Sequence, residues 1–159
     1  KRWHDIRIDE AETIRIERER VAKKEKAKQL RKEKRELIKN FMRAAEKYLP
    51  MDGFSEENNY TVFIAKSPAE LVREGNALSH CVGRRGYDKK MAREETLIFF
   101  VRKFDDLDTP FVTLEYSIKQ KKILQCYAYD NQTPDDNVIE FVNKKWLPHA
   151  NQQLQKIAA

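Results

Sequence analysis

One short stretch of the chain collects most of the side chains that could do chemistry. Residues 79–87, SHCVGRRGY, hold a histidine, a thiol, two glycines, two arginines and a tyrosine. The stretch could contain a nucleophilic cysteine with a histidine base, a metal site, or a tight turn after a helix. A nucleophilic Cys81 needs a base within hydrogen-bond reach. Side chains of adjacent residues point in different directions, so His80 is a poor base for it.

Metal binding has the right residue types but not the right spacing. The candidate ligands are His80, Cys81, Cys126 and His149. They form no CxxC, HxxxH or HExxH pattern, so we predict no metal site. The sequence leaves any cofactor unknown.

The turn interpretation explains part of the stretch. A helix that ends near His80 would leave Cys81 and Val82 buried under a sheet, and Gly83 would let the chain reverse. It does not explain why His80 lies beside two arginines and a tyrosine. Other polar residues must therefore be considered that the fold could bring to this helix end.

Alternation along three predicted strands supplies such residues. The strands are predicted at residues 96–103, 110–118 and 122–129. Alternate residues of a strand share a face, and a three-residue loop at 119–121 would pair the strands with their apolar sets on one side. That apolar side holds Val112, Leu114, Tyr116, Ile118, Leu124, Cys126 and Ala128. On the opposite face Glu115 should lie beside Gln125, and Thr113 beside Tyr127, with Arg102 as the natural partner of Glu115.

The other elements indicate an α+β fold. Residues 9–49 lack proline and glycine and are rich in Lys, Arg, Glu, Ala and Leu, which predicts one long helix. A further strand is predicted at 60–65, and Ser67-Pro68-Ala69-Glu70 is typical of a helix start. A short helix is predicted at 86–94, and a closing helix from residue 133. We predict a long charged helix (1–49) followed by a domain (50–159). In that domain a mostly antiparallel sheet of about four strands has helices on one face.

The positive charge of the chain is concentrated in its first third. Residues 1–49 carry 17 Lys and Arg against 10 Asp and Glu, whereas residues 50–159 carry 15 against 16. Apolar residues are sparse before residue 37, so this part of the helix should contact DNA, RNA or a protein partner, self-associate, or simply be solvated.

No apolar run is long enough for a membrane span. Two cysteines indicate reduced thiols and a cytoplasmic location. The start at Lys1 indicates a fragment of a longer protein.

Several segments resemble the PcfJ-like family, found on conjugative plasmids, phages and other mobile elements. They are LVREGNALSHCVGRRGY, FFVRK, TPFVTLEYS, ILQCYAYDNQTP and FVNKKW, which together span residues 60–146 and leave out the basic helix. The family pattern falls here on His80, Cys81, Val82, Gly83, Tyr87, Arg102, Thr113, Glu115, Gln125 and Asn131. Relatives often have Gln-x-Arg-Gly, whereas this chain has Gln125-Cys126-Tyr127-Ala128. The resemblance implies a mobile-element accessory protein.

Three functions follow from these observations. The first is an accessory protein that associates with nucleic acid through its basic helix. The second is an enzyme, a hydrolase or transferase acting on a nucleotide-like or anionic substrate. In it His80 would be the acid or base, Arg102 would hold the anion and Glu115 would orient or activate. The third is a protein-interaction module whose N-terminal helix pairs with another helix. The predicted catalytic residues are His80, Arg102, Thr113, Glu115 and Gln125, and the predicted binding residues are Tyr87, Arg84, Arg85, Tyr127 and Asn131.

Overall fold

The computed structural model describes residues 3–159, with side chains described from residue 6 onward. Its helices and strands form two compact units, one ending at Glu36 and one running from Leu37 to Ala159. The boundary between the units falls inside the first helix, not at its end. In the described part of the chain, no helix has the length and apolar character to cross a membrane.

Helix α1 (Trp3–Lys47) is uninterrupted because no proline or glycine occurs in it. Its last turns belong to the second unit and bury Phe41, Ala45 and Tyr48 in the core. The helix gives way to a 3₁₀ turn, Leu49–Met51, whose proline cannot continue an α-helix. Gly53 then adopts a left-handed φ of 77°. The predicted long helix is therefore confirmed.

Five antiparallel strands form one sheet in the order β1-β2-β3-β4-β5. Their bounds are β1 Phe54–Ser55, β2 Tyr60–Ile64, β3 Thr96–Lys103, β4 Val112–Ser117 and β5 Lys122–Tyr127. The α+β class is confirmed, and β1 adds a fifth strand to the predicted four. This strand has only two residues, too few for alternation to predict it.

The register between β4 and β5 confirms the predicted polar pairs. Glu115 lies opposite Gln125, and Thr113 lies opposite Tyr127. A bulge next to Glu115 then shifts the pairing, so that Tyr116 lies opposite Ile123.

This bulge corrects one sequence-based assignment. Leu124 is exposed instead of belonging to the apolar face, and Ile123 takes that place. The loop is also longer than the predicted three residues, because β4 ends opposite Lys122 and leaves residues 118–121 between the strands.

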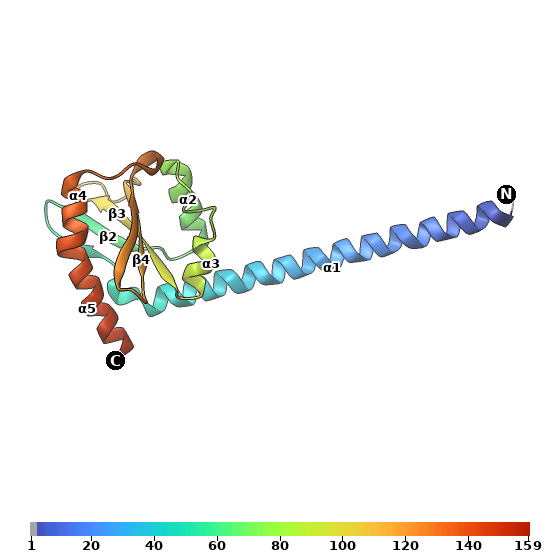
Figure 1. Cartoon of the computed structure of the whole chain (residues 1–159), viewed down its shortest axis with the longest axis horizontal. Coiled ribbons are helices and arrows are strands. Elements are labelled where there is room, and N and C mark those ends of the chain that lie inside the picture. The colour runs from blue at the N-terminus through green and yellow to red at the C-terminus, as the bar shows by residue number, and fades with distance from the viewer. Residues whose placement is uncertain (1–2) are drawn as a thin grey trace. The chain divides into compact units, whose positions relative to one another are not determined.

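Helices cover both faces of the sheet, where the sequence predicted one (Figure 1). On the apolar face, Trp146 packs edge-on against Phe99 and Tyr116, with ring centroids 4.8 and 5.7 Å away. Three consecutive helical segments cover this face: α4 (Asp136–Phe141), a π-helical turn (Val142–Trp146) and α5 (Leu147–Ala158). The π turn precedes Pro148, which has no amide hydrogen for the usual bond to the carbonyl four residues back.

The opposite, polar face is covered by α2 (Pro68–Leu78) and α3 (Tyr87–Ala92). The predicted start of α2 is confirmed, because the Ser67 side chain accepts a hydrogen bond from the Glu70 amide. The helix ends as predicted just before His80. Ser79 caps it in a left-handed conformation, with its amide bonded to the Gly75 carbonyl.

The loop at residues 79–86 packs tightly on α2 because two glycines face each other. A methyl group on Gly83 would lie 2.9 Å from the Val72 Cα and 3.0 Å from the Leu71 carbonyl oxygen. A methyl group on Gly75 would lie 3.0 Å from the His80 carbonyl oxygen. Gly83 has no left-handed φ, so close approach to the helix, not reversal of the chain, is what requires glycine there.

We expect Gly83→Ala to destabilise the fold by about 3 kcal/mol, because the α2 backbone cannot move away from the added methyl group. Gly86→Ala is the matched control. Its methyl group would meet nothing within 4 Å, and its cost of about 1 kcal/mol would come from the φ of 74°. Urea unfolding measures both, and a Gly83→Ala loss no larger than that of the control would contradict the packing argument.

Candidate functional site

A buried ion pair joins α2 to the polar face of the sheet. Arg102 on β3 donates from Nη1 to Glu74 Oε1 (2.8 Å) and from Nη2 to Glu74 Oε2 (2.6 Å). The two side chains are 9% and 3% exposed. Such a two-bond arrangement satisfies both planar groups at once and is the strongest geometry available to this pair.

The pair corrects the expectation that Arg102 would partner Glu115. Glu115 lies opposite Ile98, four residues before Arg102 on β3 and therefore about 13 Å along the strand. Glu74 is instead brought within hydrogen-bond distance of Arg102 by the packing of α2 on this face. Both terminal nitrogens of Arg102 donate to Glu74, Nη1 also donates to the Val101 carbonyl, and the buried guanidinium does not line the cavity described below.

A chain of hydrogen bonds extends from this pair to His80. Thr113 Oγ1 donates to Glu74 Oε1 (3.3 Å) and lies 2.9 Å from His80 Nε2. The Val82 amide donates to His80 Nδ1 (3.4 Å), so Nδ1 is the unprotonated nitrogen and Nε2 carries the hydrogen. Burial lowers the pKa of His80 below its usual 6.5, although the nearby Glu74 acts in the opposite direction. The imidazole is neutral and fixed in orientation at neutral pH.

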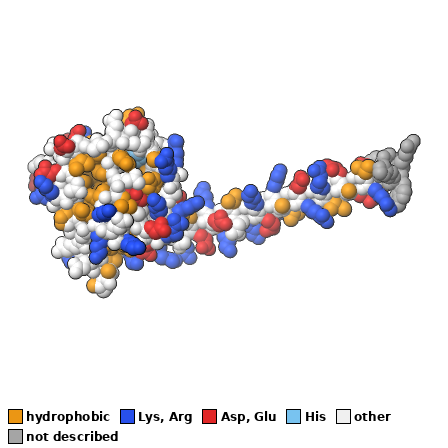
Figure 2. Space-filling model, viewed as in Figure 1, with side chains coloured by type: hydrophobic (Ala, Val, Ile, Leu, Met, Phe, Trp, Pro, Cys, Tyr) orange, Lys and Arg blue, Asp and Glu red, His pale blue; other side chains and the backbone are white. Residues whose placement is uncertain are grey.

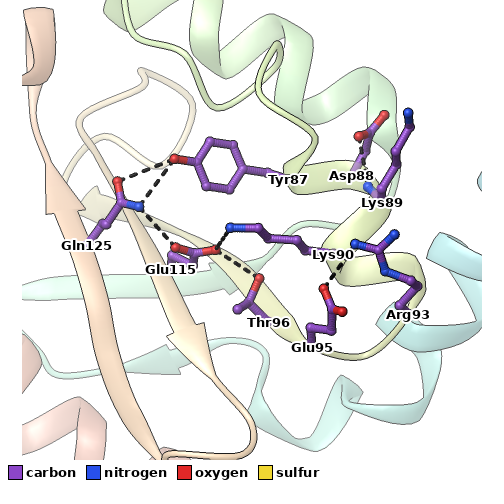
Figure 3. A network of polar contacts seen from close by, with 9 residues as sticks. All are labelled: Tyr87, Asp88, Lys89, Lys90, Arg93, Glu95, Thr96, Glu115 and Gln125. Atoms are coloured by element: carbon purple, nitrogen blue, oxygen red, sulfur yellow. Dashed lines mark hydrogen bonds and ion pairs between the residues drawn. The ribbon is translucent and has the colours of Figure 1, made fainter.

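A second polar group surrounds Glu115, a carboxylate that is 3% exposed (Figure 3). Thr96 donates to Oε2 (3.0 Å), and Gln125 donates to Oε1 (3.2 Å). The Gln125 side-chain amide also contacts the Tyr87 hydroxyl at 3.3 Å. The ionic partner of Glu115 is Lys90, whose Nζ lies 3.9 Å from Oε2 and whose side chain is 42% exposed.

A small cavity of about 30 Å³ separates the two polar groups. Seven of the ten predicted catalytic and binding residues line it, namely His80, Tyr87, Thr113, Glu115, Gln125, Tyr127 and Asn131, together with Cys81, Val82, Ile98 and Leu114. Its volume is enough for a group the size of a water molecule. It reaches the surface beside Tyr127 and Asn131, which are both exposed.

The other three predicted residues lie outside this cavity. Arg102 is held by Glu74, as described above. Arg84 and Arg85 are exposed in the loop after Val82. Neither side chain makes a hydrogen bond or ion pair with another residue in the described part of the chain, so the arginines face solvent beyond the cavity lining.

Sequence reasoning missed Glu74, which holds the site together. A signal for it was present, since Glu74 follows the buried Leu71 by three residues and precedes the buried Leu78 by four. A carboxylate at such a position of an amphipathic helix must find a partner inside the fold. Thr96 and Lys90, which contact Glu115, had no comparable signal.

The cysteines do not form a reactive centre. Cys81 lines the cavity and is half-buried. Burial raises the pKa of Cys126 to about 12, which keeps that thiol protonated. His149 packs its ring against Phe54 on the opposite side of the sheet, with centroids 4.6 Å apart. Among the described residues, no three His, Cys, Asp or Glu side chains gather in an arrangement that could hold a metal ion.

These features define a small α+β domain with a buried polar face and a cavity, preceded by a long charged helix. The chain belongs to the PcfJ-like protein family, whose sequence model matches residues 1–142. The match includes the basic helix, which corrects the narrower extent of the resemblance inferred from the motifs alone.

Known relatives add little about activity. The chain is 38% identical over 86 residues to an uncharacterized protein of Listeria innocua, Lin1253/Lin1744. The matching segment is 54% of this chain but 18% of that relative, so the chain spans a minor part of its length. No solved structure matches the chain.

We predict that Arg102→Met destabilises the protein by roughly 3–5 kcal/mol, because it leaves the Glu74 charge buried without a partner. Adding Glu74→Gln to the same chain should restore part of that loss, since the unpaired charge disappears. Lys144→Met, which breaks an exposed pair with Glu140, is the control and should cost much less. A double variant less stable than Arg102→Met, measured by urea unfolding, would contradict this account.

The lowered pKa of His80 makes stability depend on pH. Below pH 6.5 the unfolded chain takes up a proton at this histidine that the folded chain resists, so the free energy of unfolding should fall as the pH drops. His149 contributes in the same direction, because burial also lowers its pKa. Urea unfolding between pH 7.5 and 5.5 should show a smaller fall for His80→Gln. His149→Gln controls for the second histidine, and an unchanged slope in His80→Gln would refute the assignment.

Proposed function

We propose that the chain is an accessory protein of a mobile genetic element that associates with nucleic acid through one face of α1. The mobile-element role is supported by membership of the PcfJ-like family. The observation that carries the nucleic-acid role is a dense basic segment at residues 20–35, which has nine Lys and Arg against two Glu. None of the eight basic side chains from Lys23 to Arg35 makes an ion pair with another residue in the part of the chain that the structure describes.

The basic side chains of this segment share a face of the helix. Arg20, Lys24, Lys28, Arg31 and Arg35 follow one another at spacings of four or three residues, and Lys23 and Lys34 flank them. At 3.6 residues per turn these seven lie within an arc of about 140° and extend for about 22 Å. Figure 2 shows basic side chains along α1 with acidic ones between them. Seven cations in such a stripe match the regular phosphates of a nucleic acid backbone.

Pairing of this helix with another helix has less support. Within residues 6–36, the large apolar side chains that are exposed are Ile6, Ile8, Ile14, Ile16, Val21 and Leu30. At 100° per residue they fall on all sides of the helix instead of forming the stripe that a coiled coil requires. Residues 6–36 of the helix therefore offer a partner a charged face and no continuous apolar one.

In the enzymatic alternative, four of the five predicted catalytic residues lie around one cavity. The fifth, Arg102, was expected to bind the substrate anion, but both of its terminal nitrogens are bonded to Glu74. His80 also gives its Nε2 hydrogen to Thr113 and accepts the Val82 amide at Nδ1, so both ring nitrogens are already engaged. The geometry consequently supports a role in nucleic-acid association better than catalysis on an anionic substrate.

We expect the full chain to bind a 20-base-pair duplex with an affinity that falls steeply with salt. Changing Lys24, Lys28, Arg31 and Arg35 together to Gln should lower the slope of log affinity against log salt by about 3–4, because about 0.9 is lost per phosphate contact. Fluorescence anisotropy at several salt concentrations measures this slope, and a single-stranded probe of the same length tests the other nucleic-acid form.

A second variant controls for net charge. Arg15, Arg18, Lys39 and Arg43 changed to Gln remove the same four charges from α1 but lie outside the basic segment, and Arg15 already pairs with Glu12 and Glu19. This variant should retain most of the affinity. Equal losses in the two variants would show a general charge effect, and the absence of salt-sensitive binding by the unmodified chain would refute the proposal.

A further inference from the structure

Two carboxylates are buried on the polar face, and their charges are compensated very differently. Glu74 receives two short hydrogen bonds from Arg102, a buried cation, and one from Thr113. Glu115 is just as buried, at 3%, but its cation is the partly exposed Lys90 at 3.9 Å. The two hydrogen bonds it accepts, from Thr96 and Gln125, come from uncharged groups. A buried carboxylate with so weak an ionic partner is costly to the fold unless something else compensates it.

The cavity lies beside this under-compensated carboxylate. Among the residues that line it, all in the described part of the chain, Glu115 alone has a formal charge at neutral pH, since His80 is neutral. Lys90 and Thr96 approach the Oε2 atom and do not line the cavity, whereas Gln125, on Oε1, does. In Figure 3 the carboxylate lies between Gln125 on one side and Thr96 and Lys90 on the other. The cavity therefore presents one negative charge to whatever enters it.

The size and walls of the cavity narrow the choice of ligand. At about 30 Å³ it accepts a group about as large as a water molecule, which fits a primary ammonium head better than a guanidinium or a nucleobase. Tyr87 and Tyr127 line it, and aromatic rings attract cations through their faces. The Tyr87 ring already has the Lys90 ammonium 5.3 Å from its centroid.

We propose that this cavity binds a primary alkylammonium group, with Glu115 as its counter-ion and Tyr87 and Tyr127 as its walls. The stem of the ligand leaves beside Tyr127 and Asn131, where the cavity reaches the surface. Lysine side chains of peptides and free alkylamines share this chemistry. Lys90 weakens the site by sharing the charge of Glu115. The site lies wholly within the second unit and does not depend on nucleic-acid binding by α1.

Titration of the full chain with n-butylammonium chloride, followed by NMR of the Gln125 side-chain amide, tests the proposal. We expect a saturable shift that n-butanol, the uncharged analogue, does not cause. Glu115→Gln keeps hydrogen-bonding capacity toward Thr96 and Gln125 and should abolish the shift. Lys90→Met should tighten binding roughly fivefold, since one competing charge is removed. Lys89→Met, a neighbouring lysine with an exposed side chain, should leave it unchanged.

A second probe distinguishes the two sources of the ammonium group. Tighter binding of N-acetyl-lysine methylamide than of n-butylammonium would assign the site to a lysine of a peptide, and the reverse order would assign it to a free amine. Equal shifts with n-butanol, retained binding in a folded Glu115→Gln variant, or no tightening in Lys90→Met would each overturn the proposal. Because nucleic-acid binding is measured on α1 variants, the two proposals can fail separately.

Discussion

The rest of the polar face depends on the ion pair between Glu74 and Arg102. Two charges can be buried at low cost only when their geometry is close to ideal, and here the two terminal guanidinium nitrogens meet the two carboxylate oxygens. This requirement holds α2 over the end of β3. It also fixes Thr113, which donates to the same carboxylate, and through Thr113 the ring of His80. The loop that begins at the end of α2 is therefore positioned by an interaction that α2 itself makes with β3.

The same pairing determines the character of the cavity. Had Arg102 turned toward Glu115, the cavity would border a neutral pair and Glu74 would be left with an uncompensated charge. With Arg102 committed to Glu74, the remaining buried carboxylate faces the cavity with a distant, partly exposed lysine as its cation. On the proposals above, the cavity takes a cation and the basic helix takes an anion, so the two parts of the chain would bind ligands of opposite charge.

Local patterns predicted much of this structure. Alternation along β4 and β5 placed Glu115 beside Gln125, because side chains on a strand can point only to one face or the other. The cap at Ser67 and the absence of helix breakers before Pro50 predicted where helices begin and end. Prediction failed at Leu124, since a bulge inserts one extra residue and reverses the faces beyond it. It failed again at Glu74, whose importance comes from a partner 28 residues away.

The sequence alone determined the long helix, the basic segment, the two faces of β4 and the family, since these follow from residue types and their spacing along the chain. The tertiary structure decided which of two glutamates Arg102 would neutralise and which would remain beside a cavity. It also assigned Gly83 to close contact with a helix. These outcomes depend on distances between elements far apart in the sequence, and residue type does not distinguish Glu74 from Glu115. The partner of a buried charge is the opposite charge that another element of the fold brings within hydrogen-bond distance.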